Sequence, residues 1–172
     1  MISDKYKCIF VHIPKCGGTS IEKTLNGRIW RHAHVSLSNY KRRFNNKYPK
    51  YFKFTFVRNP WDKFASEYRW FTNSKYAYPV GHVKRYYRPM SFEQFLDAFL
   101  KFPYDKGDSS HRLSYTSMLN PIEDIDFIGR FENYEEDLRK VYETLGVKVG
   151  SKLPHKYKTP KKHYTEYYNV YV

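Results

Sequence analysis

Two short segments of the chain combine residue types that can bind anions. The first reads Pro-Lys-Cys-Gly-Gly-Thr-Ser and spans residues 14–20. Its glycines let the backbone come close to an oxyanion and adopt positive φ, and the free N–H groups at the start of a helix favour negative charge. Lys15 adds a mobile positive charge, while Thr19 and Ser20 add hydroxyl donors. The segment therefore predicts a phosphate-binding loop.

The order of residues in this loop differs from that in nucleoside triphosphatases. There the lysine follows the glycines and precedes a serine or threonine, whereas here Lys15 precedes Gly17 and Gly18. The alternative interpretation is a tight strand-to-helix turn that carries a surface lysine. The proline and lysine before the glycines, and the hydroxyl residues after them, favour the anion site.

The second segment is Phe56–Asp62, in which Arg58 follows an aromatic run. A guanidinium can fork onto a phosphate, and Ser66 lies two turns along the helix that Asn59 is expected to cap. The alternative is that Arg58 forms a structural ion pair, for example with Asp62, and that Ser66 is a solvated helix residue. Two anion sites at two strand ends suit a ligand with two separated anionic groups.

The elements that must position these segments alternate along the chain. Apolar runs predict strands over 7–13, 51–57 and 125–128. Capping signals predict helices that follow Thr19 or Ser20, Asn59, the box Ser91–Gln94 and the box Asn133–Glu136. Residues 28–50 and the tail from 148 show no clear element. Such alternation predicts an α/β fold with a mostly parallel sheet and helices on both faces, with ligands beyond the carboxyl ends of the strands.

Composition limits the possible partners. The chain has 172 residues with 41% hydrophobic and 20% aromatic content, so we expect one folded domain over residues 1–172. A net charge of +14 favours an anionic partner such as a nucleotide, an acidic sugar, a nucleic acid or an acidic lipid. Charge alone does not choose among them, and a merely basic surface is the alternative.

The cysteines, the acidic residues and the chain start add further expectations. Cys8 lies in an apolar run and is expected in the core, and its spacing from Cys16 is not a zinc pattern or a disulfide framework. No acidic companion for Mg²⁺ is evident, so no metal is predicted. Without a signal peptide or a long apolar span, the chain is expected to be soluble and cytoplasmic, or in the Golgi lumen if a membrane anchor was removed.

With these blocks the chain resembles the sulfotransferases that use 3′-phosphoadenosine-5′-phosphosulfate (PAPS). His12–Ser20 is similar to their 5′-phosphosulfate loop, and Phe56–Tyr68 to their 3′-phosphate strand, loop and helix. The resemblance is strongest to the carbohydrate branch, which includes heparan sulfate 2-O and chondroitin 4-O enzymes. Phe127–Asn133 and Leu153–Thr159 are also similar to that branch, although this chain is short for it.

The resemblance implies a fold, a reaction and a set of site residues. The fold is a three-layer α/β sandwich of the P-loop-like sulfotransferase type, and the reaction moves a sulfuryl group from PAPS to a hydroxyl, leaving PAP. The acceptor is a glycan or acidic sugar, with no specific nucleic acid partner. Lys15 contacts the sulfuryl group. The implied donor-binding residues are Lys15, Cys16, Gly17, Gly18, Thr19 and Ser20 for the phosphosulfate, Arg58 and Ser66 for the 3′-phosphate, and Arg130.

Sulfuryl transfer needs a base for the acceptor hydroxyl, and histidine suits that role at neutral pH. His32 and His34 lie between the two anion segments and resemble a His-x-His segment of the 2-O-sulfotransferases, which favours His34 as base and His32 as second choice. The alternative is a surface histidine pair. His111 and His155 are weaker candidates, and His12 is expected to be packed or hydrogen-bonded.

Two other functions remain open at this point. One is a small nucleotide kinase or phosphotransferase, against which the position of the lysine in the first loop argues. The other is a non-enzymatic binder of polyanions, because segments rich in lysine, arginine and tyrosine suit phosphate contacts and aromatic stacking.

Overall fold

The computed structural model describes residues 1–27, 34–72, 89–101, 113–148 and 163–168. Contacts between residues divide the chain into two compact units. The first unit comprises Met1–Arg58 with Leu113–Thr159, and the second comprises Asn59–Arg112 with Pro160–Val172. That residues 1–172 behave as a single domain stays a prediction.

The first unit holds the sheet and the helices around it. Its strands are β1 (Ile2–Ser3), β2 (Cys8–Val11), β3 (Phe52–Val57) and β4 (Phe127–Arg130). Its α-helices are α1 (Gly18–Asn26), α2 (Leu37–Arg43), α6 (Tyr115–Leu119) and α7 (Tyr134–Thr144). Three short 3₁₀ turns, η1 (Tyr48–Lys50), η3 (Ile122–Asp124) and η4 (Phe131–Asn133), complete its described elements.

The sheet is mostly parallel, as the sequence predicts. Its order is β1-β2-β3-β4, and only the short edge strand β1 runs antiparallel to its neighbour. Val11 pairs with Thr55 and Val57 pairs with Arg130. The carboxyl ends of β2, β3 and β4 therefore meet along one edge, which is the edge where ligands sit in parallel sheets.

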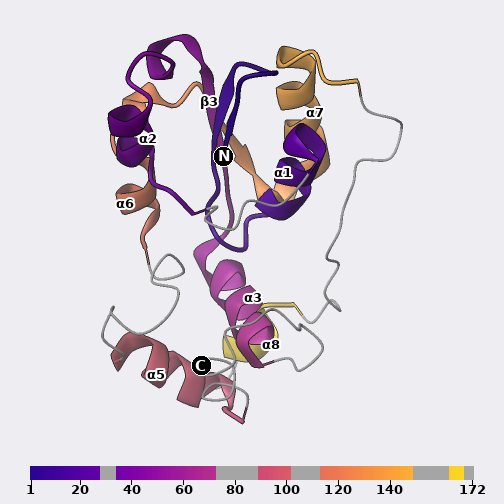
Figure 1. Cartoon of the computed structure of the whole chain (residues 1–172). Coiled ribbons are helices and arrows are strands. Elements are labelled where there is room, and N and C mark those ends of the chain that lie inside the picture. The colour runs from indigo at the N-terminus through magenta and orange to yellow at the C-terminus, as the bar shows by residue number, and fades with distance from the viewer. Residues whose placement is uncertain (28–33, 73–88, 102–112, 149–162, 169–172) are drawn as a thin grey trace. The chain divides into compact units, whose positions relative to one another are not determined.

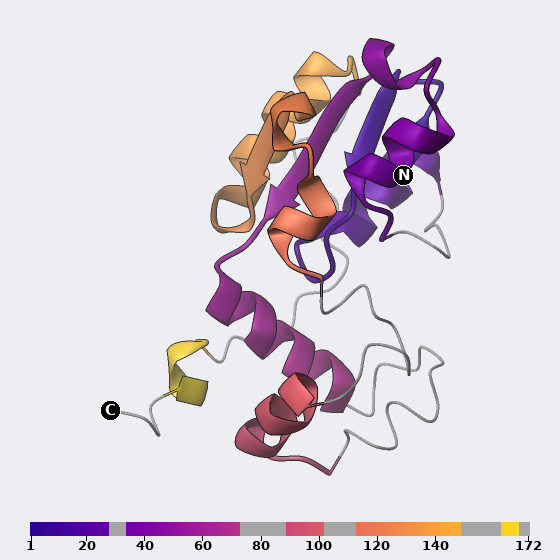
Figure 2. The same ribbon diagram turned by 90° about the vertical axis from the view of Figure 1, so that its left-hand side faces the viewer.

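Helices lie on both sides of this sheet. Figure 1 shows α1 and α7 on one side and α2 and α6 on the other, and Figure 2 gives the view from the side of α2 and α6. All four residues of β2 are buried, which is typical of a parallel strand covered on both faces. Phe10 of β2 and Phe54 of β3 stack with ring centroids 5.0 Å apart, so the core begins at the centre of the sheet.

The second unit packs around aromatic rings. Its described elements are α3 (Pro60–Thr72), α5 (Phe92–Lys101) and α8 (Thr165–Tyr168). Phe95 of α5 is fully buried, and the ring of Phe64 lies 5.4 Å from it. Aromatic pairs at such distances add about 0.5–1.5 kcal/mol beyond the area they bury, which helps a unit with few elements to hold its helices together.

Two of the four helix caps predicted from the sequence are made by the expected side chains. Asn59 caps α3, because its side-chain oxygen accepts the N–H groups of Trp61 and Asp62 at 3.0 and 3.3 Å. Ser91 and Gln94 exchange side-chain and backbone bonds at the start of α5, so this capping box is confirmed. Gly27 ends α1 with φ 70°, as expected of a glycine stop.

Four predictions about the elements are wrong in whole or in part. Thr19 or Ser20 was the expected cap of α1, but Gly17 takes that place without a side-chain bond, because its left-handed backbone already turns the chain. Asn133 lies at the N-cap position of α7, as predicted, but its side chain makes no capping bond; its amide instead donates to Asp137 at 3.3 Å. The third predicted strand exists as β4, but its bounds are Phe127–Arg130 instead of 125–128, and the stretches without expected elements contain α2 and α8.

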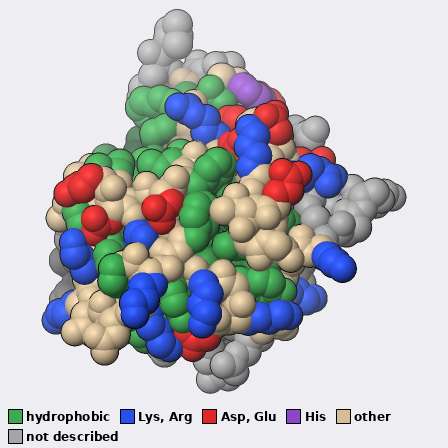
Figure 3. Space-filling view, turned by 90° about the horizontal axis from the view of Figure 1, so that it is seen from above, with side chains coloured by type: hydrophobic (Ala, Val, Ile, Leu, Met, Phe, Trp, Pro, Cys, Tyr) green, Lys and Arg blue, Asp and Glu red, His purple; other side chains and the backbone are tan. Residues whose placement is uncertain are grey.

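Positive charge is spread over the surface. Figure 3 shows Lys and Arg side chains over most of one face, most densely in its lower part, with Asp and Glu side chains interspersed mainly in the upper part. Exposed pairs such as Lys47–Asp4 and Lys41–Asp124 (both 2.9 Å) contribute only about 0–1 kcal/mol each. With 31 basic against 17 acidic residues, the excess positive charge is available to attract anions.

Two searches of the described residues gave no hit. No helix within those ranges has the length and apolar character needed to cross a membrane. The same ranges hold no group of three His, Cys, Asp or Glu residues arranged to bind a metal ion.

Candidate functional site

Three strand ends of the first unit bring the candidate site together. The loop 12–18 follows β2, Arg58 follows β3, and Phe131 follows β4. Since these strands are parallel neighbours, their carboxyl ends place the three segments side by side. The structure therefore joins the first anion loop and the arginine of the second, which lie 43 residues apart in the sequence.

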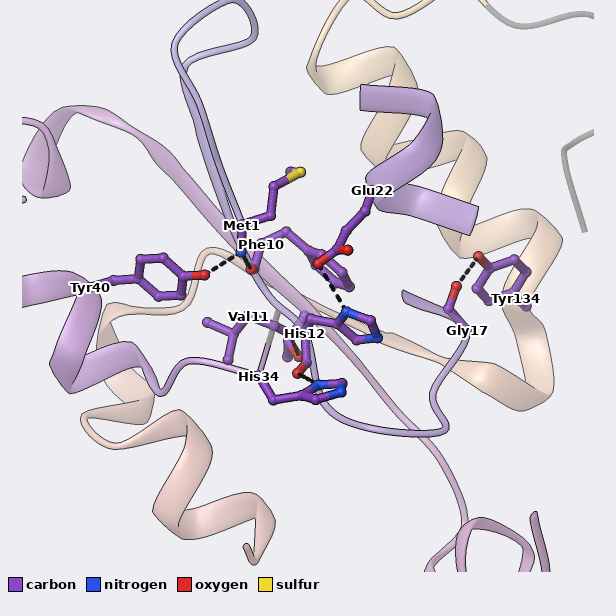
Figure 4. A network of polar contacts seen from close by, with 10 residues as sticks. Met1, Phe10, Val11, His12, Gly17, Glu22, His34, Tyr40 and Tyr134 are labelled. Carbon is purple, nitrogen blue, oxygen red and sulfur yellow. Dashed lines mark hydrogen bonds and ion pairs between the residues drawn. The ribbon is translucent and has the colours of Figure 1, made fainter. Parts of the chain in front are cut away.

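The loop after β2 has an unusual backbone. Lys15 has φ 65° and Gly17 has φ 83°, both in the left-handed region that favours glycine. A Cβ at Gly17 would lie only 2.6 Å from the ring of Tyr134. The hydroxyl of Tyr134 donates to the Gly17 carbonyl at 2.9 Å, and burial raises the pKa of this tyrosine, so it stays a neutral donor. Tyr134 of α7 thus holds the loop at Gly17 (Figure 4).

Arg58 is held against the same loop. Its Nη1 donates to the carbonyl of Lys15 at 3.0 Å, and its guanidinium lies 4.1 Å from the ring centroid of Phe131. Stacking on an aromatic ring suits the planar guanidinium and limits its motion. The guanidinium of Arg58 is therefore fixed against the backbone of Lys15, so that two residues with cationic side chains, from neighbouring strand ends, lie next to each other.

Tyr115 of α6 holds the backbone at Arg58. Its hydroxyl accepts the Arg58 N–H at 3.3 Å and donates to the Arg58 carbonyl at 2.5 Å. Burial raises the pKa of Tyr115 above its ordinary value, and the nearby Cys16 thiol adds to this effect. The hydroxyl therefore remains protonated and able to make both contacts at neutral pH.

His34 lies beside the start of the loop. Its Nδ1 is 2.9 Å from the carbonyl oxygen of His12, and the two imidazole rings meet edge to face at 4.5 Å between centroids. His12 itself is buried and bonded to Glu22 at 2.9 Å, which confirms that it is a packed, hydrogen-bonded residue. Figure 4 shows His34 next to His12, on the same side as the loop.

The other predicted site residues have different positions. Cys16 and Ser20 are buried within the loop and first turn of α1, whereas Thr19 is half-buried. Arg130 ends β4 with an exposed side chain, and its N–H donates to Asp137 at 2.8 Å. Ser66 is buried on α3 in the second unit. The roles of these residues in binding stay predictions.

Three of the candidate histidines lie outside the described residues. They are His32, His111 and His155. His34 is thus the candidate base whose surroundings the structure describes.

Sequence reasoning missed the residues that brace the site. Tyr115, Phe131 and Tyr134 each contact a loop residue that is at least 57 positions away in the sequence. Their local sequence does not show these contacts, because each contact exists only once the strands are paired. Phe131 lies within the block Phe127–Asn133 and Tyr134 within the capping box Asn133–Glu136, and these two patterns were the signals that could have drawn attention to them.

Removal of the Tyr115 hydroxyl tests this bracing. We expect Tyr115→Phe to lower the free energy of unfolding by about 1–2 kcal/mol, because it leaves the Arg58 carbonyl without its donor. Urea denaturation followed by circular dichroism measures the change. Tyr48→Phe is a matched control. The ring of Tyr48 is also buried, and its hydroxyl donates to Asp124 at 2.8 Å near the opposite end of β3. A loss at Tyr115 well below that at Tyr48 would contradict the bracing role.

Comparison with known proteins gives one match. The family model described as "Sulfotransferase family" covers residues 1–169, nearly the whole chain and all of the site described above. Neither the search of curated proteins nor the search of solved structures returned a match.

Proposed function

Because this chain belongs to the sulfotransferase family, we propose that it transfers a sulfuryl group from PAPS to a hydroxyl of a carbohydrate. The observation that carries the proposal is the bond between the Arg58 guanidinium and the Lys15 carbonyl at 3.0 Å. It joins the residues that carry the two cationic side chains at one edge of the sheet, which suits a donor with a 3′-phosphate and a 5′-phosphosulfate.

In this proposal the loop residues bind the phosphosulfate. The N–H groups of Gly17, Gly18, Thr19 and Ser20 lie at the start of α1, where the helix dipole favours an anion. Lys15 neutralises the charge that develops on the departing phosphate. A positive charge held beside the departing oxygen stabilises the charge that develops there, which is the main catalytic effect in transfers of this kind.

In the same scheme Arg58 binds the 3′-phosphate, while the assignment of Ser66 to that phosphate and the approach of Arg130 to the donor stay predictions of the sequence. The guanidinium is preorganised by the Lys15 carbonyl and the Phe131 ring. Preorganisation lowers the entropy lost on binding, so a large share of the donor affinity is assigned to Arg58.

The transfer itself is an in-line displacement. The bond between sulfur and the 5′-phosphate oxygen breaks and leaves its electron pair on PAP, while the acceptor oxygen bonds to sulfur. The acceptor proton passes to Nε2 of His34. A carbonyl only accepts hydrogen bonds, so Nδ1 of His34 carries a proton toward His12, and the neutral ring has its basic lone pair on Nε2.

A transfer assay tests the proposal. The full chain is incubated with PAPS carrying labelled sulfate and with desulfated heparan, chondroitin and dermatan chains, small alcohols and phenols. Label in a polysaccharide is the expected result, together with binding of PAP by calorimetry. Binding of ATP with Mg²⁺ in place of PAP would instead identify a phosphotransferase. Salt-sensitive binding of single-stranded DNA without PAP binding would identify a polyanion binder.

Arg58 gives a separate prediction for donor binding. We expect Arg58→Ala to raise the Kd for PAP by about 10- to 100-fold, since a hydrogen bond to a charged group contributes about 1.5–3 kcal/mol. Arg58→Lys should recover only part of the loss, because lysine lacks the planar fork. Arg42→Ala removes the same charge from exposed α2 and is the matched control. Equal effects at positions 42 and 58 would mean that net charge alone sets the affinity.

A further inference from the structure

His12 and Glu22 form a buried pair that the proposed transfer does not use. Nδ1 of His12 lies 2.9 Å from Oε1 of Glu22, and their side chains are 6% and 0% exposed. Burying a carboxylate is costly unless it is well paired. The pair lies next to the loop 12–18, so its role depends on which neighbouring groups it holds in position.

The His12 ring of the pair packs against the end of the loop 12–18. A Cβ at Gly18 would collide with the imidazole of His12, so this ring fills the space beneath the first residue of α1. Glu22 is one turn further along the same helix. The ring of Phe10 stacks on His12 with centroids 5.6 Å apart. His12 is therefore enclosed by α1 and β2, and Glu22 sets the direction in which its Nδ1 points.

The other end of the pair is tied to His34. The His12 carbonyl accepts from Nδ1 of His34 at 2.9 Å, and the two rings touch at 4.5 Å with an angle of 65° between their planes. Figure 4 shows Glu22, His12 and His34 in one continuous chain of contacts. A turn of the His12 ring would press on the His34 ring and disturb the carbonyl bond.

We propose that Glu22 is a positioning residue, which acts through His12 to hold His34 as the tautomer with the proton on Nδ1. Glu22 accepts the Nδ1–H of His12 and keeps that ring in place. The ring and the His12 carbonyl together keep the basic lone pair of His34 on Nε2. The catalytic meaning of this arrangement rests on the proposed function, whereas the tautomer can be measured without any assay of transfer.

Other groups also face Glu22 and must be controlled. They are the amino group of Met1, which precedes the strand β1, and the hydroxyl of Tyr40, from α2; these two groups are hydrogen-bonded to each other. Burial lowers the pKa of the Met1 amino group to about 5, and the negative charge of Glu22 opposes that shift. Any variant that removes the charge of Glu22 affects both groups.

A pair of variants of equal size separates the charge from the hydrogen bond. Glu22→Gln and Glu22→Met both remove the charge, but only glutamine keeps an oxygen that can accept from His12. Long-range ¹H–¹⁵N correlation spectra of the full chain, at a pH of about 8 where imidazole is neutral, report which nitrogen of His34 bears the proton. Lys23→Gln, at the next and exposed position of α1, is the control.

The expected result is the Nδ1–H tautomer of His34 in the wild type, in Lys23→Gln and in Glu22→Gln, and a mixture of both tautomers in Glu22→Met. The inference is overturned if Glu22→Met leaves the tautomer unchanged, or if wild-type His34 bears its proton on Nε2. Should Glu22→Met not fold, Glu22→Ala removes the same acceptor and replaces it in the comparison.

Kinetics give a second readout. Rates are divided by the concentration of PAP-binding sites, so that unfolded protein does not count. Glu22→Met should then lower kcat by about 10- to 100-fold, the range expected when a catalytic group is slightly misplaced, while Glu22→Gln stays within about 3-fold of wild type. In a His34→Asn background Glu22→Met should cost no more than about 3-fold; a fully additive loss would overturn the inference. If the wild type transfers no sulfate but the tautomers behave as expected, the proposed function fails and the positioning role stands.

Discussion

Replacement of Lys15 by asparagine is expected to lower kcat for sulfuryl transfer by about 10³-fold, the size of effect seen when a preorganised charge at a transferring group is removed. Asparagine is chosen because it adopts positive φ more readily than other residues with a side chain. With Lys15 at φ 65°, an alanine would add backbone strain to the loss of the amine. The asparagine variant therefore measures the loss of the lysine amine without added backbone strain.

The measurement is initial-rate transfer from labelled PAPS, together with PAP affinity by calorimetry. PAP lacks the sulfuryl group, so its Kd should rise by no more than about 10-fold when Lys15 is lost. Turnover within about 10-fold of wild type would remove Lys15 from the transfer step. A loss confined to PAP binding, with kcat intact, would make Lys15 a binding residue only.

Replacement of His34 by asparagine should lower kcat by about 10²- to 10⁴-fold, the range of a general base, with little change in PAP affinity. The asparagine amide can still donate to the His12 carbonyl, so it preserves the contact seen at 2.9 Å but has no basic nitrogen. The fall in wild-type rate at acid pH, which a histidine base produces, should be absent from the residual activity.

Two controls make this test decisive. His163→Ala changes an exposed histidine of the second unit and should leave turnover unchanged. If His34→Asn instead kept full activity while His34→Ala lost it, the contact with the His12 carbonyl alone would explain the need for His34, and the base would have to lie elsewhere.

The two strand–loop–helix blocks could be predicted from the sequence because their signals are local. An apolar run followed by Pro14 and two glycines marks β2, the loop and α1, and Asn59 with Pro60 marks the start of α3. These patterns also placed both loops at carboxyl ends of parallel strands, which the pairing of β2, β3 and β4 confirms. That Lys15 and Arg58 lie together follows from this topology.

The remaining parts depend on contacts that no local pattern contains. Helix α2 buries only Leu37 and Tyr40 in its 7 residues, too few to give a helical period. No local sequence pattern marks Tyr115, since its two hydrogen bonds to Arg58 join residues that are 57 positions apart. The pair of His12 and Glu22 could not be predicted, because the two side chains meet only in the folded structure.

The left-handed backbone at Lys15 has a consequence for engineering. A residue with a side chain pays about 1 kcal/mol or more in this conformation, whereas glycine does not. A screen for heat resistance alone would therefore favour glycine at position 15 and remove the amine to which the proposed transfer assigns a role. Directed evolution of this chain has to score sulfate turnover in every round.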